Sequence, residues 1–407
     1  MSTLVRPAWR WVLSMLIAGA GSSACRNVEG GRLPRPTIDT LPSGAVRVHS
    51  EGPTAWREGE GWRLVEEIRI TGDEGTESEV INPSSVTVDA QGRIWLVDQK
   101  PAGIKVYERD GRFVRTVGRE GEGPGELRVG FLAAAGGFMV LHDPRVTRTS
   151  VYDTAGVFVR SWSSQCCYWS EIAVDKAGRI YVPGMWGGKG EPSGTTYYRY
   201  TLDGTPVDTL VVPMGEDVRY WTVKSGKGQS EMMMTTSVPF TPEMRYGFDP
   251  EGGFVLGWSG DYQLAVSRTG RDTIGLFGRS WTAEPIPDVL RRDTVEAMIK
   301  DHDNIDPALL RASFHVEDVP AVRPAFEDLT VAVDGHRWVR VGPWPGGGTR
   351  YDVFDPSGAW LGAVQVPVVF SPWRGVTIGA DYFVVPIEDE DGRPAIVRYR
   401  IEKTSTT

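Results

Sequence analysis

A repeat of short hydrophobic runs separated by glycine turns organises most of the chain. Its clearest copy covers residues 85–118 and contains two hydrophobic runs joined near Gly92 and two more joined near Gly111. Runs of this length with glycine at the connections are typical of β-strands linked by tight turns. One copy therefore predicts a sheet of four short strands, and its repetition predicts an array of such sheets.

Diverged copies follow the first one along the chain. Their first turns lie at Gly136, Gly178, Gly252 and Gly335, and a weaker last copy covers residues 376–401. An array of six four-stranded units predicts an all-β fold, a six-bladed β-propeller with four-stranded blades.

The ends of the chain suggest how this ring closes. The last copy stops after its third strand, whereas residues 62–70 form a hydrophobic run that precedes the first copy and belongs to no blade. An unclosed propeller would expose unpaired strand edges. We expect residues 62–70 to be the outer strand of the sixth blade.

Two blade connections are longer than the others. The first turns are separated by 44 residues (Gly92 to Gly136) and 42 residues (Gly136 to Gly178), but the next two intervals are 74 and 83 residues. The extra segments, about 212–244 and 279–325, predict insertions on one rim of the propeller. Within the first we expect a hairpin, and within the second an amphipathic helix capped by Asp288 and a shorter helical turn opened by Asp306 and Pro307.

The N-terminus has the pattern of an export signal. Arg6 and Arg10 precede a short apolar run and small residues that end at Cys25. Cysteine at this place resembles the lipobox of bacterial lipoproteins, although Ser22 also suits ordinary signal cleavage. We predict a signal peptide (1–24), a lipid-anchored flexible tether (25–60) and the propeller (61–403). The predicted location is the bacterial cell envelope outside the cytoplasm, anchored to a membrane by lipid, with a secreted or periplasmic protein as the alternative.

The charge of the chain argues against a nucleic-acid partner. Without residues 1–24, 42 basic side chains face 53 acidic ones, a net charge of −11. Binding to a duplex relies on neutralisation of phosphates by a basic surface. We expect a monomer that meets the membrane only through its N-terminal lipid.

Residues 82–127 closely resemble NHL-type repeats. The resemblance rests on Val88-Asp89, the strand that begins at Gly92, the turn at Asp110-Gly111 and the run Gly121-Glu-Gly-Pro-Gly-Glu-Leu127. It implies a six-bladed propeller of the kind found in exported bacterial proteins, many of them lipoproteins of undefined role.

Some propellers of this kind are metal-dependent enzymes, and their ligands can be sought here. Lactonase-like propellers hold Ca²⁺ on the axis with Glu, Asp and Asn, but the only asparagines, Asn27, Asn82 and Asn304, are not placed to line it. Amidating lyases bind zinc through histidines, and no histidine pair here has ligand spacing on one strand. We interpret His142 and His336 as structural or surface residues, and we predict no metal, no cofactor and no catalytic residue.

Aromatic side chains gather in the loops of one predicted face. Six of the 15 tryptophans lie there, in loops after a second strand or between blades: Trp186, Trp258, Trp344, Trp169, Trp281 and Trp373. Each indole either packs on its own blade or belongs to an exposed aromatic rim that binds a ligand. Our hypothesis is that Trp186, Trp258 and Trp344 surround the mouth of the axis.

Four arginines and a cysteine pair complete the candidate site. Arg145, Arg148 and Arg350 are candidates for carboxylate binding. Arg340 stands where other blades have aliphatic residues, so it either pairs with an acid near the axis or contacts a ligand. Cys166 and Cys167 form either a vicinal disulfide or two free thiols.

These features favour a non-catalytic binding module for a protein, a peptide or a glycan. The alternatives are a metal-dependent propeller hydrolase or lyase and a structural component of the envelope.

Overall fold

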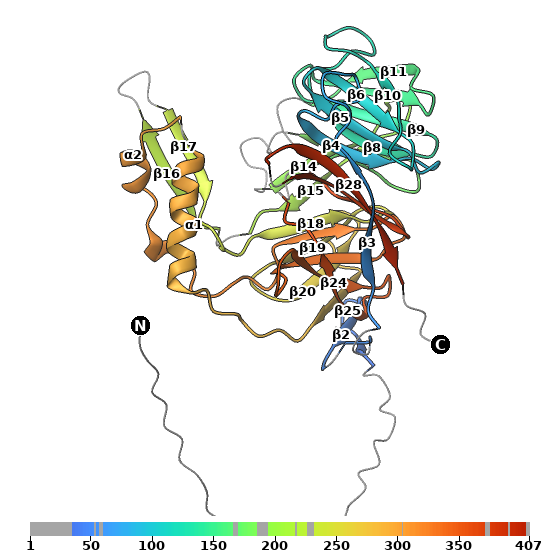
Figure 1. Cartoon of the computed structure of the whole chain (residues 1–407). Helices are drawn as coiled ribbons and strands as arrows, with labels where there is room; N and C mark the ends of the chain where they lie inside the picture. Colours follow the sequence, from blue (N-terminus) through green and yellow to red (C-terminus); the bar gives the residue numbers. More distant parts are fainter. Residues whose placement is uncertain are drawn as a thin grey trace, which may run out of the picture. The chain divides into compact units, whose positions relative to one another are not determined.

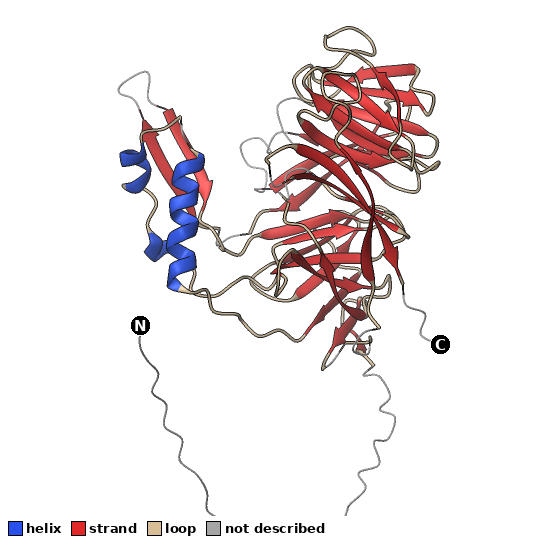
Figure 2. Cartoon of the chain, in the orientation of Figure 1, coloured by secondary structure: helices blue, strands red, loops and turns tan. Residues whose placement is uncertain are grey.

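The computed structural model describes residues 35–403 except 53, 57–59, 166–169, 185–193, 216–217, 226–231, 303, 371–374 and 390. Strands dominate this part of the chain, and they form six blades of a β-propeller (Figures 1 and 2). The predicted fold class is confirmed.

The first three blades are four-stranded antiparallel sheets of consecutive strands. Blade one contains β4 (Pro83–Val88), β5 (Ile94–Gln99), β6 (Ala102–Tyr107) and β7 (Phe113–Val117). Blade two contains β8 (Phe131–Ala135), β9 (Phe138–Asp143), β10 (Arg148–Asp153) and β11 (Phe158–Ser163). Blade three contains β12 (Ala173–Val174), β13 (Ile180–Gly184), β14 (Gly194–Tyr200) and β15 (Pro206–Pro213).

The remaining blades repeat this arrangement with strands from more distant parts of the chain. Blade four contains β18 (Met244–Phe248), β19 (Phe254–Trp258), β20 (Gln263–Ser267) and β21 (Gly275–Arg279). Blade five contains β22 (Asp328–Val331), β23 (Arg337–Pro343), β24 (Thr349–Phe354) and β25 (Trp360–Val366). Blade six contains β26 (Thr377–Ile378), β27 (Tyr382–Glu388), β28 (Pro394–Glu402) and β3 (Arg63–Ile70).

The repeated Asp-x-x-Gly sequence explains the turn between the first and second strands. In blade one, Asp89 accepts hydrogen bonds from the amides of Gln91 and Arg93, both at 2.9 Å, and from the indole of Trp95 at 2.8 Å. Gly92 has a φ of 83°, which favours glycine. Asp175 makes the same bonds in blade three, where the hydroxyl of Tyr181 replaces the indole. The aspartate thus ties the turn to the core of its blade.

The N-terminal strand closes the ring as predicted. β3 pairs antiparallel with β28 from Ile70 opposite Ile396 to Arg63 opposite Glu402, and Figure 1 shows it beside that last strand. The pairing covers the open edge of blade six.

A second N-terminal segment corrects the expectation of a flexible tether up to residue 60. β1 (Thr37–Thr40) and β2 (Val46–Ser50) form a hairpin, and β2 pairs in parallel with β21, which extends blade four to six strands. Ala45 and Val48 are buried by this docking. Burial of these side chains stabilises a segment whose composition alone had suggested a linker.

The two insertions fold together into one small module. The first supplies the hairpin of β16 (Tyr220–Ser225) and β17 (Met232–Ser237), and the second supplies α1 (Asp288–Asp301), α2 (Pro307–Arg311) and a 3₁₀ turn (Val316–Asp318) (Figure 2). Their shared core includes Trp221 stacked on Phe314, with ring centroids 4.7 Å apart.

The helix starts in this module match the sequence in one case and differ in the other. Asp306 caps α2 by accepting a hydrogen bond from the amide of Ala308, as predicted. Asp288 does not cap α1: it is the first helical residue, and its carboxylate pairs with Arg291 one turn later. No helix in the described part of the chain is long and apolar enough to span a membrane.

Candidate functional site

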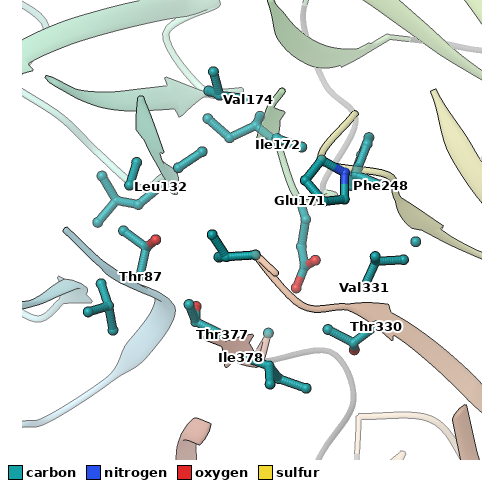
Figure 3. Close-up of a pocket in the computed structure, with 18 of the residues that line it drawn as sticks. Thr87, Leu132, Glu171, Ile172, Val174, Phe248, Thr330, Val331, Thr377 and Ile378 are labelled. Atoms are coloured by element: carbon teal, nitrogen blue, oxygen red, sulfur yellow. The ribbon is translucent and has the colours of Figure 1, made fainter. Parts of the chain in front are cut away.

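The first strands of the six blades enclose a central channel. Its cavity measures about 1630 Å³, and residues of β4, β8, β12, β18, β22 and β26 line it. Much of the wall is apolar: Figure 3 shows Leu132, Ile172, Val174, Phe248, Val331 and Ile378 around the cavity, with the hydroxyls of Thr87, Thr330 and Thr377 among them. A cavity of this kind suits a ligand with an apolar part.

Three ionisable residues occupy equivalent positions at one end of this channel. Glu171, Arg245 and Asp328 each stand seven residues before the first turn glycine of their blade, at Gly178, Gly252 and Gly335. All three line the cavity, and they come from the consecutive blades three, four and five. Blade one places Ser85 at the same distance from Gly92. The sequence analysis missed these residues, although this spacing was the signal that could have found them.

Glu171 extends its carboxylate into the cavity. Figure 3 shows it pointing toward the region of Thr330 and Thr377, on the far side of the channel from its own blade. Its Oε1 lies 2.8 Å from the position that a Cβ atom on Gly375 would take, so the missing side chain at Gly375 leaves room for the carboxylate. The Glu171 carboxylate has no hydrogen bond or ion pair with any described residue.

The environment of Glu171 opposes its ionisation. Solvent inside the channel reaches the Glu171 side chain, but the walls of the channel surround this position with protein. Desolvation by these walls, together with the negative charge of Asp328, raises the pKa of Glu171 to about 7. A carboxyl group that titrates near neutral pH inside a cavity is typical of a functional site.

Asp328 is the second carboxylate of the channel, and it too lacks an ion-pair partner among the described residues. It lies opposite Arg340 on the neighbouring strand β23. Burial raises the pKa of Asp328, while the more distant charges of Arg245 and Arg340 lower it. The balance leaves the pKa above its usual range.

Nearby arginines are held by other acids. Arg245 pairs with Glu243 through Nη2 and Oε2 at 3.0 Å. Arg340 pairs with Glu327 through Nε and Oε2 at 3.4 Å, and it donates a hydrogen bond to the carbonyl of Phe370. The position of Arg340 therefore matches an arginine that pairs with an acid near the axis.

Tyr197 and Tyr246 line the channel, whereas Tyr351 is buried within blade five behind the channel wall. Tyr351 lies opposite Arg340 in the next strand and is fully buried, and its hydroxyl has no hydrogen-bond partner among the described residues. Burial and the nearby Asp328 raise its pKa. The hydroxyls of Tyr197 and Tyr246 are 2.9 Å apart, and Tyr197 lies 3.4 Å from the hydroxyl of Ser170.

The tryptophans chosen from the sequence lie at this end of the blades but farther from the axis. Trp258 pairs with Met244 at the start of β18, and Trp344 follows β23. Neither lines the channel, because the loop after a second strand starts one strand away from the axis. The half-buried Trp258 instead packs where Gly215 and Gly260 leave room for its ring, beside a second cavity of about 960 Å³. The hypothesis that Trp186, Trp258 and Trp344 surround the mouth of the axis stays a prediction: Trp258 and Trp344 do not line the cavity itself, and Trp186 lies outside the described residues.

The other arginines predicted as ligand contacts have different surroundings. Arg148 donates hydrogen bonds to the carbonyls of Glu122 and Glu126 at 2.7 and 3.0 Å, which holds the loop before blade two. Arg350 lies 3.5 Å from a carboxylate oxygen of Asp352 within its own blade. Arg145 is exposed in the loop after β9.

Several predicted residues fall outside the described part of the chain: Cys25, Cys166, Cys167, Trp169, Trp186 and Trp373. Trp281 is half-buried against the core of blades four and five.

The described residues contain no group of three or more His, Cys, Asp and Glu side chains arranged to hold a metal ion. His142 is fully buried in blade two, and the ring of His336 lies 3.0 Å from the carboxylate of Asp334.

Comparisons with known proteins reveal similarity of fold only. No protein-family model and no curated protein sequence matches the chain. Among solved structures, the chain is similar to a candidate exported protein of Bacteroides fragilis, with 12% identity, a TM-score of 0.47 and coverage of 88% of this chain and 100% of that one. It is also similar to a DUF4221 family member of Bacteroides vulgatus, with 11% identity, a TM-score of 0.45 and coverage of 84% and 99%. Virginiamycin B lyase of Staphylococcus aureus has 12% identity, a TM-score of 0.43 and coverage of 83% and 99%.

Proposed function

We propose that this chain is a non-catalytic binding protein that receives one end of a peptide or glycan ligand in its axial channel. The observation that carries the proposal is the Glu171 carboxylate, which projects into the cavity without a protein partner in the described residues. An unpaired carboxyl group in a partly desolvated place destabilises the fold, so a structural role does not account for it. A ligand that supplies the missing hydrogen bonds does.

Binding is favoured over the alternative of a metal-dependent hydrolase or lyase. Such an enzyme holds its ion with at least three protein ligands in most sites. Within the described ranges, the channel offers two carboxylates that lack an ion-pair partner, Glu171 and Asp328.

The loops that carry Trp258 and Trp344 extend the proposed binding surface outward. Both loops leave the blades at the end where Glu171 and Asp328 lie. A peptide or glycan longer than the channel would meet these loops, and the flat indole faces suit both kinds of ligand.

A binding screen tests the proposal. Purified protein is titrated calorimetrically with a library of short peptides and a panel of oligosaccharides, and the best ligand is then titrated into the double variant Glu171→Gln/Asp328→Asn. We expect its affinity to fall at least tenfold, because hydrogen bonds to charged groups contribute about 1.5–3 kcal/mol and each 1.4 kcal/mol corresponds to about tenfold.

The matched control for this screen is Glu251→Gln. Glu251 is an exposed carboxylate that pairs with Lys176 at the other end of the blades, so its loss should leave the affinity unchanged. Equal affinities of the wild type and the double variant would place the ligand elsewhere and refute the proposal.

We further propose that the protein acts outside the cytoplasm on a lipid anchor at Cys25. The support is the sequence of residues 1–25, a charged start, an apolar run and small residues before the cysteine. Cells grown with a clickable palmitate analogue should label the wild type and leave Cys25→Ser unlabelled. An unlabelled wild type recovered from the medium would instead indicate ordinary secretion.

A further inference from the structure

We propose that the channel binds a primary ammonium group between the carboxylates of Glu171 and Asp328, with the apolar part of the same ligand lying along the channel wall. This inference rests on the proposed binding function and names the chemical class of the ligand: an organic amine with an apolar chain.

The first argument is the distribution of charge at this end of the cavity. Two carboxylates line this end of the cavity, Glu171 of blade three and Asp328 of blade five, and neither forms an ion pair with a described residue. Two arginines stand near these positions in the blades, Arg245 and Arg340. Arg245 pairs with Glu243 at 3.0 Å and Arg340 with Glu327 at 3.4 Å. Among the described residues, this end of the channel therefore offers no cation that contacts both carboxylates.

The second argument is a buried hydroxyl beside Asp328. Tyr351, Arg340 and Asp328 lie opposite one another across β24, β23 and β22, which puts their side chains on the same face of the blade. Tyr351 is fully buried, its hydroxyl has no partner, and it is close enough to Asp328 for the carboxylate to raise its pKa. A primary ammonium has three N–H donors. Tyr351 does not line the cavity, so Glu171 and Asp328 are the acceptors that a ligand in the channel can reach, and the Tyr351 hydroxyl contributes only to the polar surroundings of Asp328.

The third argument is the wall of the channel. The side chains that Figure 3 shows around the cavity are mostly aliphatic or aromatic, among them Ile172, Phe248 and Val331. Such a wall gives an alkyl chain a dry surface. A hydrated divalent ion would gain nothing from it, and Ca²⁺ takes six to eight oxygen ligands.

The ionisation of Glu171 makes this binding dependent on pH. Asp328 on β22 is the charged group that acts on Glu171, and Asp328 is in turn influenced by Arg245 on β18 and by Arg340 on β23. Because the pKa of Glu171 lies at about 7, the carboxylate is mostly protonated at pH 6 and mostly ionised at pH 8. A cation prefers the ionised form, so affinity should rise roughly tenfold between these values, and binding near pH 7 should release a proton.

The test uses three probes that differ only in their head group: n-hexylamine, 1-hexanol and hexanoate. Ligand-observed NMR and calorimetry measure their binding to the purified protein at pH 6, 7 and 8. We expect hexylammonium to bind at least tenfold more tightly than hexanol and hexanoate to bind most weakly. Glu171→Gln should remove most of the preference for the amine, and Glu251→Gln should leave it unchanged. A melting curve for each variant shows whether it is folded.

Three results would overturn the inference. Equal binding of hexanol and hexylammonium would show that the channel recognises only the alkyl chain. Complete displacement of hexylammonium by millimolar CaCl₂ or MgCl₂ would indicate a divalent cation site. A peptide or glycan whose affinity falls in Glu171→Gln, but which binds equally well after its amine is removed, would refute the inference and still support the proposed function. If no library ligand and no probe binds, both fail.

Discussion

A chain that lacks residues 35–70 is expected to be insoluble or unfolded, because β3 is the last strand of blade six. Its pairing with β28 continues over seven residue pairs, from Ile396 to Glu402. Loss of β3 removes the buried side chains of Leu64 and Ile70 and exposes the whole edge of β28 to other chains. Each buried aliphatic side chain contributes about 2–5 kcal/mol when truncated, which is a large share of the roughly 5–15 kcal/mol that holds a domain folded.

A single charge in β3 offers a finer test of the same closure. The guanidinium of Arg398 is 1% exposed, and its Nε lies 3.1 Å from Oε2 of Glu67. Glu67→Ala leaves this buried cation without its partner, which costs about 3–5 kcal/mol for buried pairs. The neighbouring Glu66→Ala is the matched control, since Glu66 pairs with Arg69 at the surface, and such pairs contribute about 0–1 kcal/mol.

Urea unfolding and size-exclusion chromatography measure these differences. A chain that lacks only residues 1–34 should remain a soluble, folded protein, since β1, β2 and β3 are kept. A chain that also lacks β1 and β2 should be destabilised, because their removal uncovers β21. If the chain without β3 has the same free energy of unfolding in urea as the chain that keeps it, ring closure by this strand contributes nothing to stability.

Much of the architecture was predictable because one local interaction recurs in it. Asp89 and Asp175 each bind the amides of a turn that ends in a glycine with positive φ, so the same short sequence marks the same turn in different blades. The closing strand was predictable for a related reason. One blade lacked a strand, and one hydrophobic run lacked a blade.

Features that depend on docking between distant segments were not predictable. The sequence around β2 contains no strong strand signal, and its pairing with β21 becomes favourable only once blade four has formed. The helix and the hairpin of the module come from separate insertions, and each was interpreted alone. Their common core, with Trp221 against Phe314, exists only when both are present.

The candidate site was found from geometry, because the sequence alone draws attention to other side chains at this end of the blades. Indoles in glycine-rich loops are conspicuous in a sequence, whereas the residues that line the cavity include common acids such as Glu171 and Asp328. An acid at the start of a strand has no distinctive neighbourhood in sequence. Such an acid is recognised as a candidate site residue only from its spacing to the turn glycine and from its lack of an ion-pair partner among the described residues.

Acid is expected to destabilise the protein through His142. This side chain is fully buried, its Nδ1 lies 3.2 Å from the hydroxyl of Ser164, and its Nε2 has no hydrogen-bond partner. Burial lowers the pKa of His142 from 6.5 to about 4. The unfolded chain therefore binds a proton below pH 6.5 that the folded chain rejects until about pH 4. The stability contributed by the neutral ring is present above pH 6.5 and is lost as the pH falls toward 4.

The size of this effect is about 3 kcal/mol, since each unit of pKa difference corresponds to about 1.4 kcal/mol. Glu171 and Asp328 act in the opposite direction over part of this range, because their pKa values are raised in the folded state and acid therefore favours folding through them. A comparison with a variant is needed to isolate the histidine. His142→Leu removes the titrating ring and leaves Thr149 and Ser164 bonded to each other at 3.0 Å.

The measurement is the free energy of unfolding by urea at pH 7, 6, 5 and 4.5, for the wild type, His142→Leu and the control His315→Gln. His315 is an exposed histidine, so its replacement should leave the pH dependence of the wild type in place. We expect the variant His142→Leu to lose less stability on acidification than the wild type, with a difference that grows steadily below pH 6.5. Parallel curves for all three proteins would show that the buried ring accepts a proton in the folded state as readily as in the unfolded chain.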